Sequence, residues 1–201
     1  MEPFEERIRA ERFQAIAGLD EAGRGPLAGP VVAGAVILPE TGGWAGINDS
    51  KLLSARQREE AFFLLQEKAL AIAVGIVGVE EIDRRNILQA SLRAMEVAVQ
   101  NLAIPPDYLL IDGNQGLPNL RLPQEAIPQG DRRCVSIAAA SIIAKVTRDR
   151  LMTEYHEQYP QYNFARHKGY ATKEHLEALR KHGFCPLHRQ SFKPIYQLSL
   201  F

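Results

Sequence analysis

Short apolar runs alternate with longer amphipathic segments along the chain, a pattern typical of a mixed α/β domain. The short runs predict strands, which cover residues 14–20, 30–38, 71–79 and 108–111, with one more short strand before Gly130. Apolar residues at helical spacing predict helices, which extend from 54 to about 68, 82 to about 102, 135 to about 159 and 172 to 182. Because the link between the first two strands is short, we expect them to be antiparallel neighbours. The pattern predicts a central mixed sheet of five strands flanked by helices.

Cap and breaker residues set the ends of the predicted helices. Ser54 followed by Gln57 forms a capping box, and Pro105–Pro106 ends the second helix. The third helix begins with small apolar residues and becomes charged after Lys145. We therefore expect its start to pack closely against a neighbour and its end to be solvated. The segment 160–171 is expected to be a loop.

Length and composition indicate an ordinary globular protein. The chain has 201 residues, of which 46% are hydrophobic and 24% charged, so we expect a single domain over 1–201. No apolar run is long enough to span a bilayer, and the N-terminus lacks the pattern of a secretion signal. Two cysteines, Cys134 and Cys185, are too few for a disulfide framework. These features predict a cytoplasmic monomer that does not associate with membranes.

Charge is distributed unevenly, although the formal net charge is zero. Residues 1–130 carry 12 Lys and Arg against 18 Asp and Glu, whereas residues 131–201 carry 12 against 6 and all five histidines. A basic C-terminal third beside an acidic site indicates a polyanionic partner held next to a metal. Basic, solvated helix faces would produce the same charge count, so charge alone does not decide between the two interpretations.

Acidic residues stand at or just beyond three of the predicted strand ends. They are Asp20–Glu21, Asp112 and Asp131. Ligands gather at strand ends of α/β sheets, and converging carboxylates raise one another's pKa unless a metal ion is present. Asp112 before Gly113 could instead form a turn, and Asp131 could cap the following helix. Asp20–Glu21 has no such structural use, which favours a site for magnesium or manganese.

Two glycine-containing segments could approach a nucleic acid. Gly23-Arg24-Gly25 is either a tight turn or a place where a nucleic-acid backbone comes close to main-chain amides and to Arg24. Tyr170 follows His167-Lys168-Gly169, where it could stack on a sugar or a base, or simply be half-buried in a loop. In isolation, each segment is more typical of the structural alternative.

The segment from Asp20 to Val31, DEAGRGPLAGPV, resembles the opening signature of ribonuclease HII, the bacterial type 2 ribonuclease H. Further blocks of the resemblance follow in order between about 14 and 193, at residues 49–52, 111–114, 130–131, 137–149, 167–172 and 188–192. Type 3 enzymes lack the Gly-Arg-Gly turn and usually carry an added N-terminal domain. The turn and the short N-terminus of this chain therefore favour type 2.

The resemblance implies a ribonuclease H fold with a catalytic core over about 14–158 and a C-terminal helical extension over about 159–201. It implies an endoribonuclease that cleaves the RNA strand of RNA–DNA hybrids and nicks 5′ to ribonucleotides embedded in duplex DNA. Two Mg²⁺ or Mn²⁺ ions would serve the reaction, which leaves 3′-hydroxyl and 5′-phosphate ends. The implied catalytic and metal-binding acids are Asp20, Glu21, Asp112 and Asp131. The implied contacts to the RNA–DNA junction are Gly23, Arg24, Gly25 and Tyr170.

Some features of the site stay open at the level of sequence. Charge and position suggest five phosphate contacts, which could equally be solvated surface residues: Lys51, Asn86, Lys145, Arg148 and Lys168. Adjacent strand residues face opposite ways, so either the strand ends between Asp20 and Glu21 or Glu21 contributes partly through its backbone. A junction resolvase is disfavoured by the Gly-Arg-Gly turn and Tyr170. A non-catalytic binding module is disfavoured because clustered acids repel phosphates.

Overall fold

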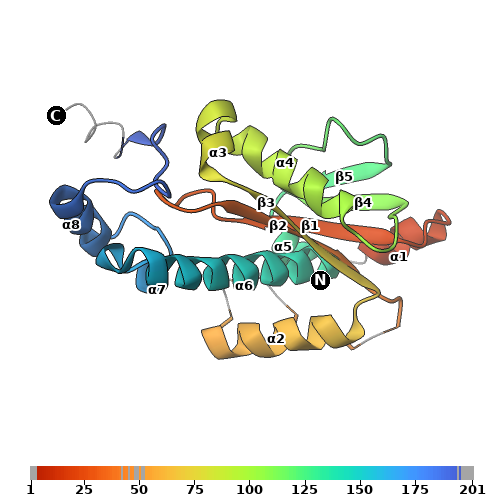
Figure 1. The fold of residues 1–201 in the computed structure, drawn as a ribbon. Coiled ribbons are helices and arrows are strands. Elements are labelled where there is room, and N and C mark those ends of the chain that lie inside the picture. The colour runs from red at the N-terminus through yellow and green to blue at the C-terminus, as the bar shows by residue number, and fades with distance from the viewer. Residues whose placement is uncertain are drawn as a thin grey trace.

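A five-stranded mixed sheet forms the centre of the computed structural model, which describes residues 4–41, 43–44, 46–47, 50, 53–193 and 195. The order across the sheet is β3-β2-β1-β4-β5 (Figure 1). The strands are β1 (Ile16–Ala22), β2 (Val31–Ile37), β3 (Ala71–Val77), β4 (Tyr108–Asp112) and β5 (Gln124–Ile127). β2 is antiparallel to β1 and β3, whereas β4 is parallel to β1 and β5. The predicted fold class and the antiparallel pairing of the first two strands are confirmed.

Helices cover both faces of this sheet. They are α1 (Phe4–Ala10), α2 (Ala55–Lys68), α3 (Val79–Arg85), α4 (Ile87–Gln100), α5 (Gly130–Arg133), α6 (Val135–Gln158), α7 (Phe164–His167) and α8 (Lys173–His182), with a 3₁₀ turn η1 (Pro160–Tyr162). α4 packs on one face and α6 on the other, with α2 outside α6 (Figure 1). α7 and α8 lie near the C-terminal end of α6. None of the helices in the described ranges is long and apolar enough to cross a membrane.

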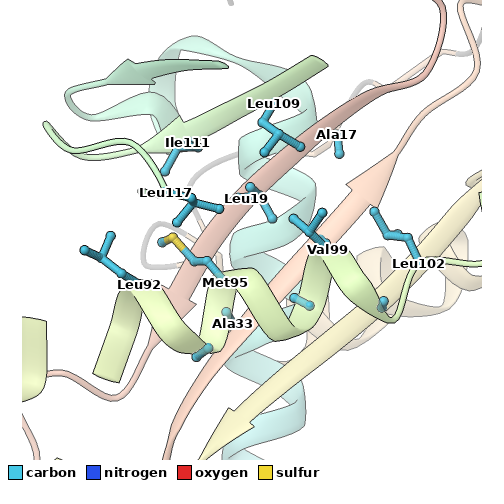
Figure 2. Packing of buried hydrophobic residues seen from close by; sticks show 14 of the residues in the cluster. Ala17, Leu19, Ala33, Leu92, Met95, Val99, Leu102, Leu109, Ile111 and Leu117 are labelled. Atoms are coloured by element: carbon cyan, nitrogen blue, oxygen red, sulfur yellow. The ribbon is translucent and has the colours of Figure 1, made fainter. Parts of the chain in front are cut away.

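The core between the sheet and α4 is made of aliphatic side chains. Leu19 of β1 and Ile111 of β4 lie with Met95 and Val99 of α4, and all four are buried (Figure 2). Odd-numbered residues of β1 contribute to this cluster, since alternate strand residues share a face. The even-numbered residues of β1, Asp20 among them, therefore face α6.

Glycine allows α6 to approach the opposite face of the sheet closely. A Cβ on Gly18 would lie 2.1 Å from the carbonyl carbon of Ser136, and one on Gly34 would lie 2.4 Å from the carbonyl oxygen of Ala140. Ala138 and Ala139 of α6 are fully buried. The predicted close packing of the small apolar start of this helix is confirmed, and it sets the distance of α6 from β1.

A residue far away in the sequence caps the start of α6. Its N-cap residue, Cys134, makes no side-chain cap bond, and instead Glu5 of α1 accepts the N–H of Ser136 at 2.9 Å. A carboxylate at this position also interacts favourably with the helix dipole. The sequence pattern did not predict α1.

Three predicted boundaries are corrected by the structure. β1 continues to Ala22 because Asp20 and Glu21 pair with residues of β2. The predicted helix over 82–102 is two helices, since Asn86 between α3 and α4 has a φ of 75° and caps α4 by accepting the N–H of Gln89. The predicted loop over 160–171 contains η1 and α7. The capping box of Ser54 and Gln57 is confirmed. The division into a catalytic core and a C-terminal extension near residue 159 stays a prediction.

Candidate active site

Two of the predicted acids lie on adjacent parallel strands. Leu19 of β1 is in register with Ile111 of β4, and the next residue on each strand is Asp20 and Asp112 respectively. Glu21 follows Asp20 within β1, so the alternative in which the strand ends between the two acids is wrong. Asp20 and Glu21 therefore lie within the paired part of the sheet and not beyond its end, because Asp20 pairs with Gly34 of β2.

Asp131 joins this group through the loop that follows β5. The N–H of Gly130 donates a 2.7 Å hydrogen bond to Oδ1 of Asp112, and Asp131 is the next residue. Asp131 lies inside α5 and is 4% exposed. The alternative in which Asp131 caps the long helix is wrong, since the N-cap of α6 is Cys134.

The pKa of Asp20 is raised well above its ordinary value. Burial is the largest cause, and the neighbouring carboxylates of Glu21 and Asp112 add to it. Hydrogen bonds from the Ser141 hydroxyl of α6 and from the N–H of Glu21, the latter 2.7 Å from Oδ1, act in the opposite direction. A charged Asp20 is therefore costly in this position unless a cation balances it.

The chemistry of the donors fits a hard divalent cation, because all the predicted ligands are carboxylates. In the part of the chain that the structure describes, no three His, Cys, Asp or Glu side chains are already arranged to hold one metal ion. The metal site therefore stays a prediction, supported by donor chemistry and by the raised pKa of Asp20.

The link between β1 and β2, residues 23–30, is called the Gly-Arg-Gly loop below. Gly23 has a φ of +101°, and a Cβ there would lie 2.2 Å from Nε of Arg148, so the fold itself requires glycine. Gly25 has no positive φ, and the nearest atom to a Cβ there would be Cε1 of Tyr170 at 3.7 Å. The structure thus brings together Gly25 and Tyr170, whose side chain is exposed.

The phosphate contacts proposed from charge have different environments. Arg148 is 1% exposed and donates to three main-chain carbonyls, so its prediction as a direct phosphate contact is wrong. Lys145 pairs with Asp149 at 2.7 Å. Lys168 donates to Oγ1 of Thr153 at 2.8 Å, and burial lowers its pKa. Asn86 caps α4, as described above, and Lys51 lies outside the described residues.

A residue absent from the predicted site also holds the Gly-Arg-Gly loop. Arg189 is fully buried, and its guanidinium donates to the carbonyls of Gly23 and Arg24. The only signal in the sequence is its place in the last block of the resemblance, 188–192, because nothing local predicts that an arginine there would be buried.

Buried histidines connect the C-terminal segment to the backbone of Tyr170. The N–H of Cys185 donates to Nδ1 of His188, at 2.9 Å, so the proton of His188 is on Nε2. That Nε2 lies 3.0 Å from Nε2 of His175, which must accept, and Nδ1 of His175 donates to the carbonyl of Tyr170 at 2.9 Å. The tautomer of His188 follows from the Cys185 N–H, which can only donate, and that of His175 from the Tyr170 carbonyl, which can only accept. Both rings are neutral in this arrangement.

Acidic pH is expected to destabilise the fold through these rings. Burial lowers the pKa of His175 and of His188 from 6.5 to about 4, and the neighbouring histidines contribute. Below pH 6.5 the unfolded chain therefore binds more protons than the folded chain. One such histidine lowers the free energy of unfolding by about 2 kcal/mol between pH 7.5 and 5. Urea denaturation across this range measures it.

The matched variants for this experiment are His175→Asn and His182→Asn. An asparagine at 175 cannot titrate but can still donate to the Tyr170 carbonyl, so we expect a flatter dependence on pH. The exposed His182 should leave the wild-type dependence unchanged. Equal slopes for wild type and His175→Asn would contradict the assignment to this cluster.

The family model of ribonuclease HII matches residues 17–195. This chain belongs to the ribonuclease HII family. A ribonuclease HII of Geobacter metallireducens is 56% identical over 192 residues, which are 96% of this chain and 90% of that protein. One of Enterococcus faecalis is 54% identical over 97% of this chain and 76% of its own length. The family is one of endoribonucleases, so the predicted family and enzyme class are confirmed.

Three solved ribonuclease H structures share the fold of this chain. Ribonuclease H2 of Pyrococcus horikoshii has a TM-score of 0.79 and 28% identity, over 93% of this chain and 98% of that one. The ribonuclease HII of Archaeoglobus fulgidus, solved in a complex with PCNA, has a TM-score of 0.76 and 26% identity, over 89% and 95% of the two chains. Bst-RNase HIII with Mn²⁺, at 19% identity and a TM-score of 0.69 over 93% of this chain and 70% of that one, shows the fold alone.

Proposed function

We propose that this ribonuclease HII cleaves the RNA strand of RNA–DNA hybrids and nicks duplex DNA 5′ to embedded ribonucleotides, leaving 3′-hydroxyl and 5′-phosphate ends. The observation that carries the proposal is one continuous segment of chain. It begins with the buried Asp20, whose neighbours Glu21 and Asp112 raise its pKa, and it reaches the contact between Gly25 and Tyr170 a few residues later. A buried acid that needs a cation, on β1, and a surface that a substrate backbone could approach closely, on the loop directly after it, thus lie within one short stretch of chain.

Asp20, Glu21, Asp112 and Asp131 would hold two Mg²⁺ or Mn²⁺ ions in this reaction. When bound, such a pair of ions activates the attacking water and stabilises charge on the leaving 3′ oxygen. Glu21 faces away from Asp20 on β1, and its carboxylate accepts a 3.0 Å hydrogen bond from Arg24, which supports a contribution from its backbone. Ser141 orients Asp20 from α6.

Recognition of the ribonucleotide is assigned to Gly23, Arg24, Gly25 and Tyr170. The 2′-hydroxyl distinguishes RNA from DNA at a given nucleotide. At Gly25 neither a positive φ nor packing within the protein requires glycine, so the missing side chain is best explained by an approaching ligand. Tyr170 is exposed beside it and can stack on the adjoining sugar. Lys145 and Lys168 are proposed to contact phosphates, and a cytoplasmic monomer stays a prediction.

Duplex DNA with a single embedded ribonucleotide tests the proposed function directly. We expect a nick immediately 5′ to the ribonucleotide when Mg²⁺ or Mn²⁺ is added, and none after chelation with EDTA. The same duplex without a ribonucleotide should stay intact. Failure of the folded chain to nick the first substrate with either metal contradicts the proposal.

Gly25→Ala separates recognition from folding. Since an alanine there meets only an ordinary contact at 3.7 Å, the free energy of unfolding should change by less than about 0.5 kcal/mol. We expect kcat/KM on the single-ribonucleotide duplex to fall about tenfold or more, because the methyl group displaces the substrate backbone. Gly43→Ala, in open space, is the matched control and should change neither quantity. Wild-type kcat/KM in Gly25→Ala would remove Gly25 from the substrate surface.

A further inference from the structure

Two arginines are buried side by side beneath the Gly-Arg-Gly loop. Arg148 and Arg189 are 1% and 0% exposed. Burial lowers the pKa of both guanidiniums, and for Arg189, whose pKa falls to about 9, the charge of Arg148 is the next cause. Both stay charged at neutral pH. Buried cations are normally neutralised by carboxylates, yet neither arginine forms an ion pair with any residue in the described ranges.

Main-chain carbonyls take the place of carboxylates around these two side chains. Arg189 donates to the carbonyls of Gly23 at 2.6 Å, Arg24 at 3.1 Å, Gly29 at 2.8 Å and Pro30 at 3.3 Å. Arg148 donates at 3.0 Å each to the carbonyls of Ala28, Pro30 and Lys168. The two guanidiniums therefore share the carbonyl of Pro30 and together tie the loop to the segment that precedes Tyr170.

The geometry of the peptide bond turns these contacts into an orientation of the loop's N–H groups. All peptide bonds of the described residues are trans, so each C=O points opposite to the N–H of the next residue. The carbonyls of Gly23 and Arg24 point towards the buried Arg189, and the N–H groups of Arg24 and Gly25 consequently point away from it. Neither N–H has an acceptor among the described residues.

We propose that Arg189 is a positioning residue for ribonucleotide recognition, which turns the N–H groups of Arg24 and Gly25 towards the sugar-phosphate of the substrate. This role rests on the proposed function and deepens it. Arg148 holds the other half of the loop in the same way.

Arg189→Lys and Arg189→Met separate orientation from charge. Lysine keeps the positive charge but lacks the planar fork that reaches four carbonyls, and methionine loses both. If orientation dominates, both variants raise KM for the single-ribonucleotide duplex by about tenfold or more, while kcat changes less than KM. A merely structural role would lower the active fraction, and hence the apparent kcat, without moving KM. If the KM of Arg189→Lys equals that of the wild type, the orienting role of Arg189 is overturned.

Controls keep the two proposals apart. Arg180→Lys and Arg180→Met, at an exposed position of α8, should leave KM unchanged. Nicking of the ribonucleotide duplex by the wild-type chain tests the proposed function by itself. If the wild type nicks this duplex and the KM of Arg189→Lys equals that of the wild type, only the role of Arg189 is overturned.

A second measurement uses the wild-type chain and does not depend on the variants folding. The amide NMR signals of Arg24 and Gly25 are followed while the single-ribonucleotide duplex is added in EDTA. We expect both amide protons to move downfield as they donate to the substrate. A duplex that shifts the signals around Tyr170 and leaves both amides unmoved overturns the proposal.

Discussion

Asp112→Asn is expected to reduce cleavage of the single-ribonucleotide duplex by about a thousandfold or more, because losing one metal-binding carboxylate removes several kcal/mol of charge stabilisation in the transition state. The fold should persist. Asparagine keeps an oxygen that can accept the N–H of Gly130, which lies 2.7 Å from Oδ1 of Asp112. Single-turnover cleavage measures the rate, and fluorescence anisotropy measures binding of the duplex, which we expect to be largely intact.

Glu67→Gln is the matched control for this prediction. It makes the same carboxylate-to-amide change on an exposed position of α2, away from the acids of β1 and β4, and should leave the cleavage rate unchanged. A cleavage rate of Asp112→Asn within about tenfold of wild type would remove Asp112 from the catalytic set.

Gly18→Ala is expected to lower the free energy of unfolding by about 3 kcal/mol, a large share of the roughly 5–15 kcal/mol typical of a domain. A Cβ at this position would lie 2.1 Å from the carbonyl carbon of Ser136 and 2.4 Å from the nitrogen of Ile137. Both are backbone atoms of α6, so relief requires the helix to move away from β1. This movement would also separate Ser141 from Asp20, and we expect activity to fall with stability.

Urea denaturation of Gly18→Ala and Gly43→Ala measures the effect of packing alone. At Gly43 a Cβ would have no atom within 4 Å, and the backbone has no positive φ, so the alanine variant should be as stable as wild type. Equal stability of Gly18→Ala and wild type would show that α6 tolerates displacement, and would contradict the close packing of helix and sheet.

Local patterns in the sequence were sufficient for the five strands and for helices α2, α6 and α8. The apolar run through Leu19 predicted a buried strand, and Ser54 with Gln57 predicted the start of α2, since both signals involve only neighbouring residues. The same patterns gave wrong boundaries where contacts with distant parts of the chain determine where a strand or helix ends. Asp20 and Glu21 were expected at a strand end, but pairing with β2 carries β1 through them. A single helix was expected across Asn86, where a positive φ separates two.

The motif blocks and their order are visible in the sequence alone. They were sufficient to identify the family, the candidate acids and the candidate junction residues. Only the tertiary structure decided how those residues are supported. It placed Asp112 beside Asp20 through the register of β1 and β4, and it removed Arg148 from the candidate phosphate contacts by burying its guanidinium. It also brought Arg189 under the Gly-Arg-Gly loop, about 160 residues away in the chain. A side chain's charge is visible in the sequence, whereas its burial and its partners depend on segments that meet only in the folded chain.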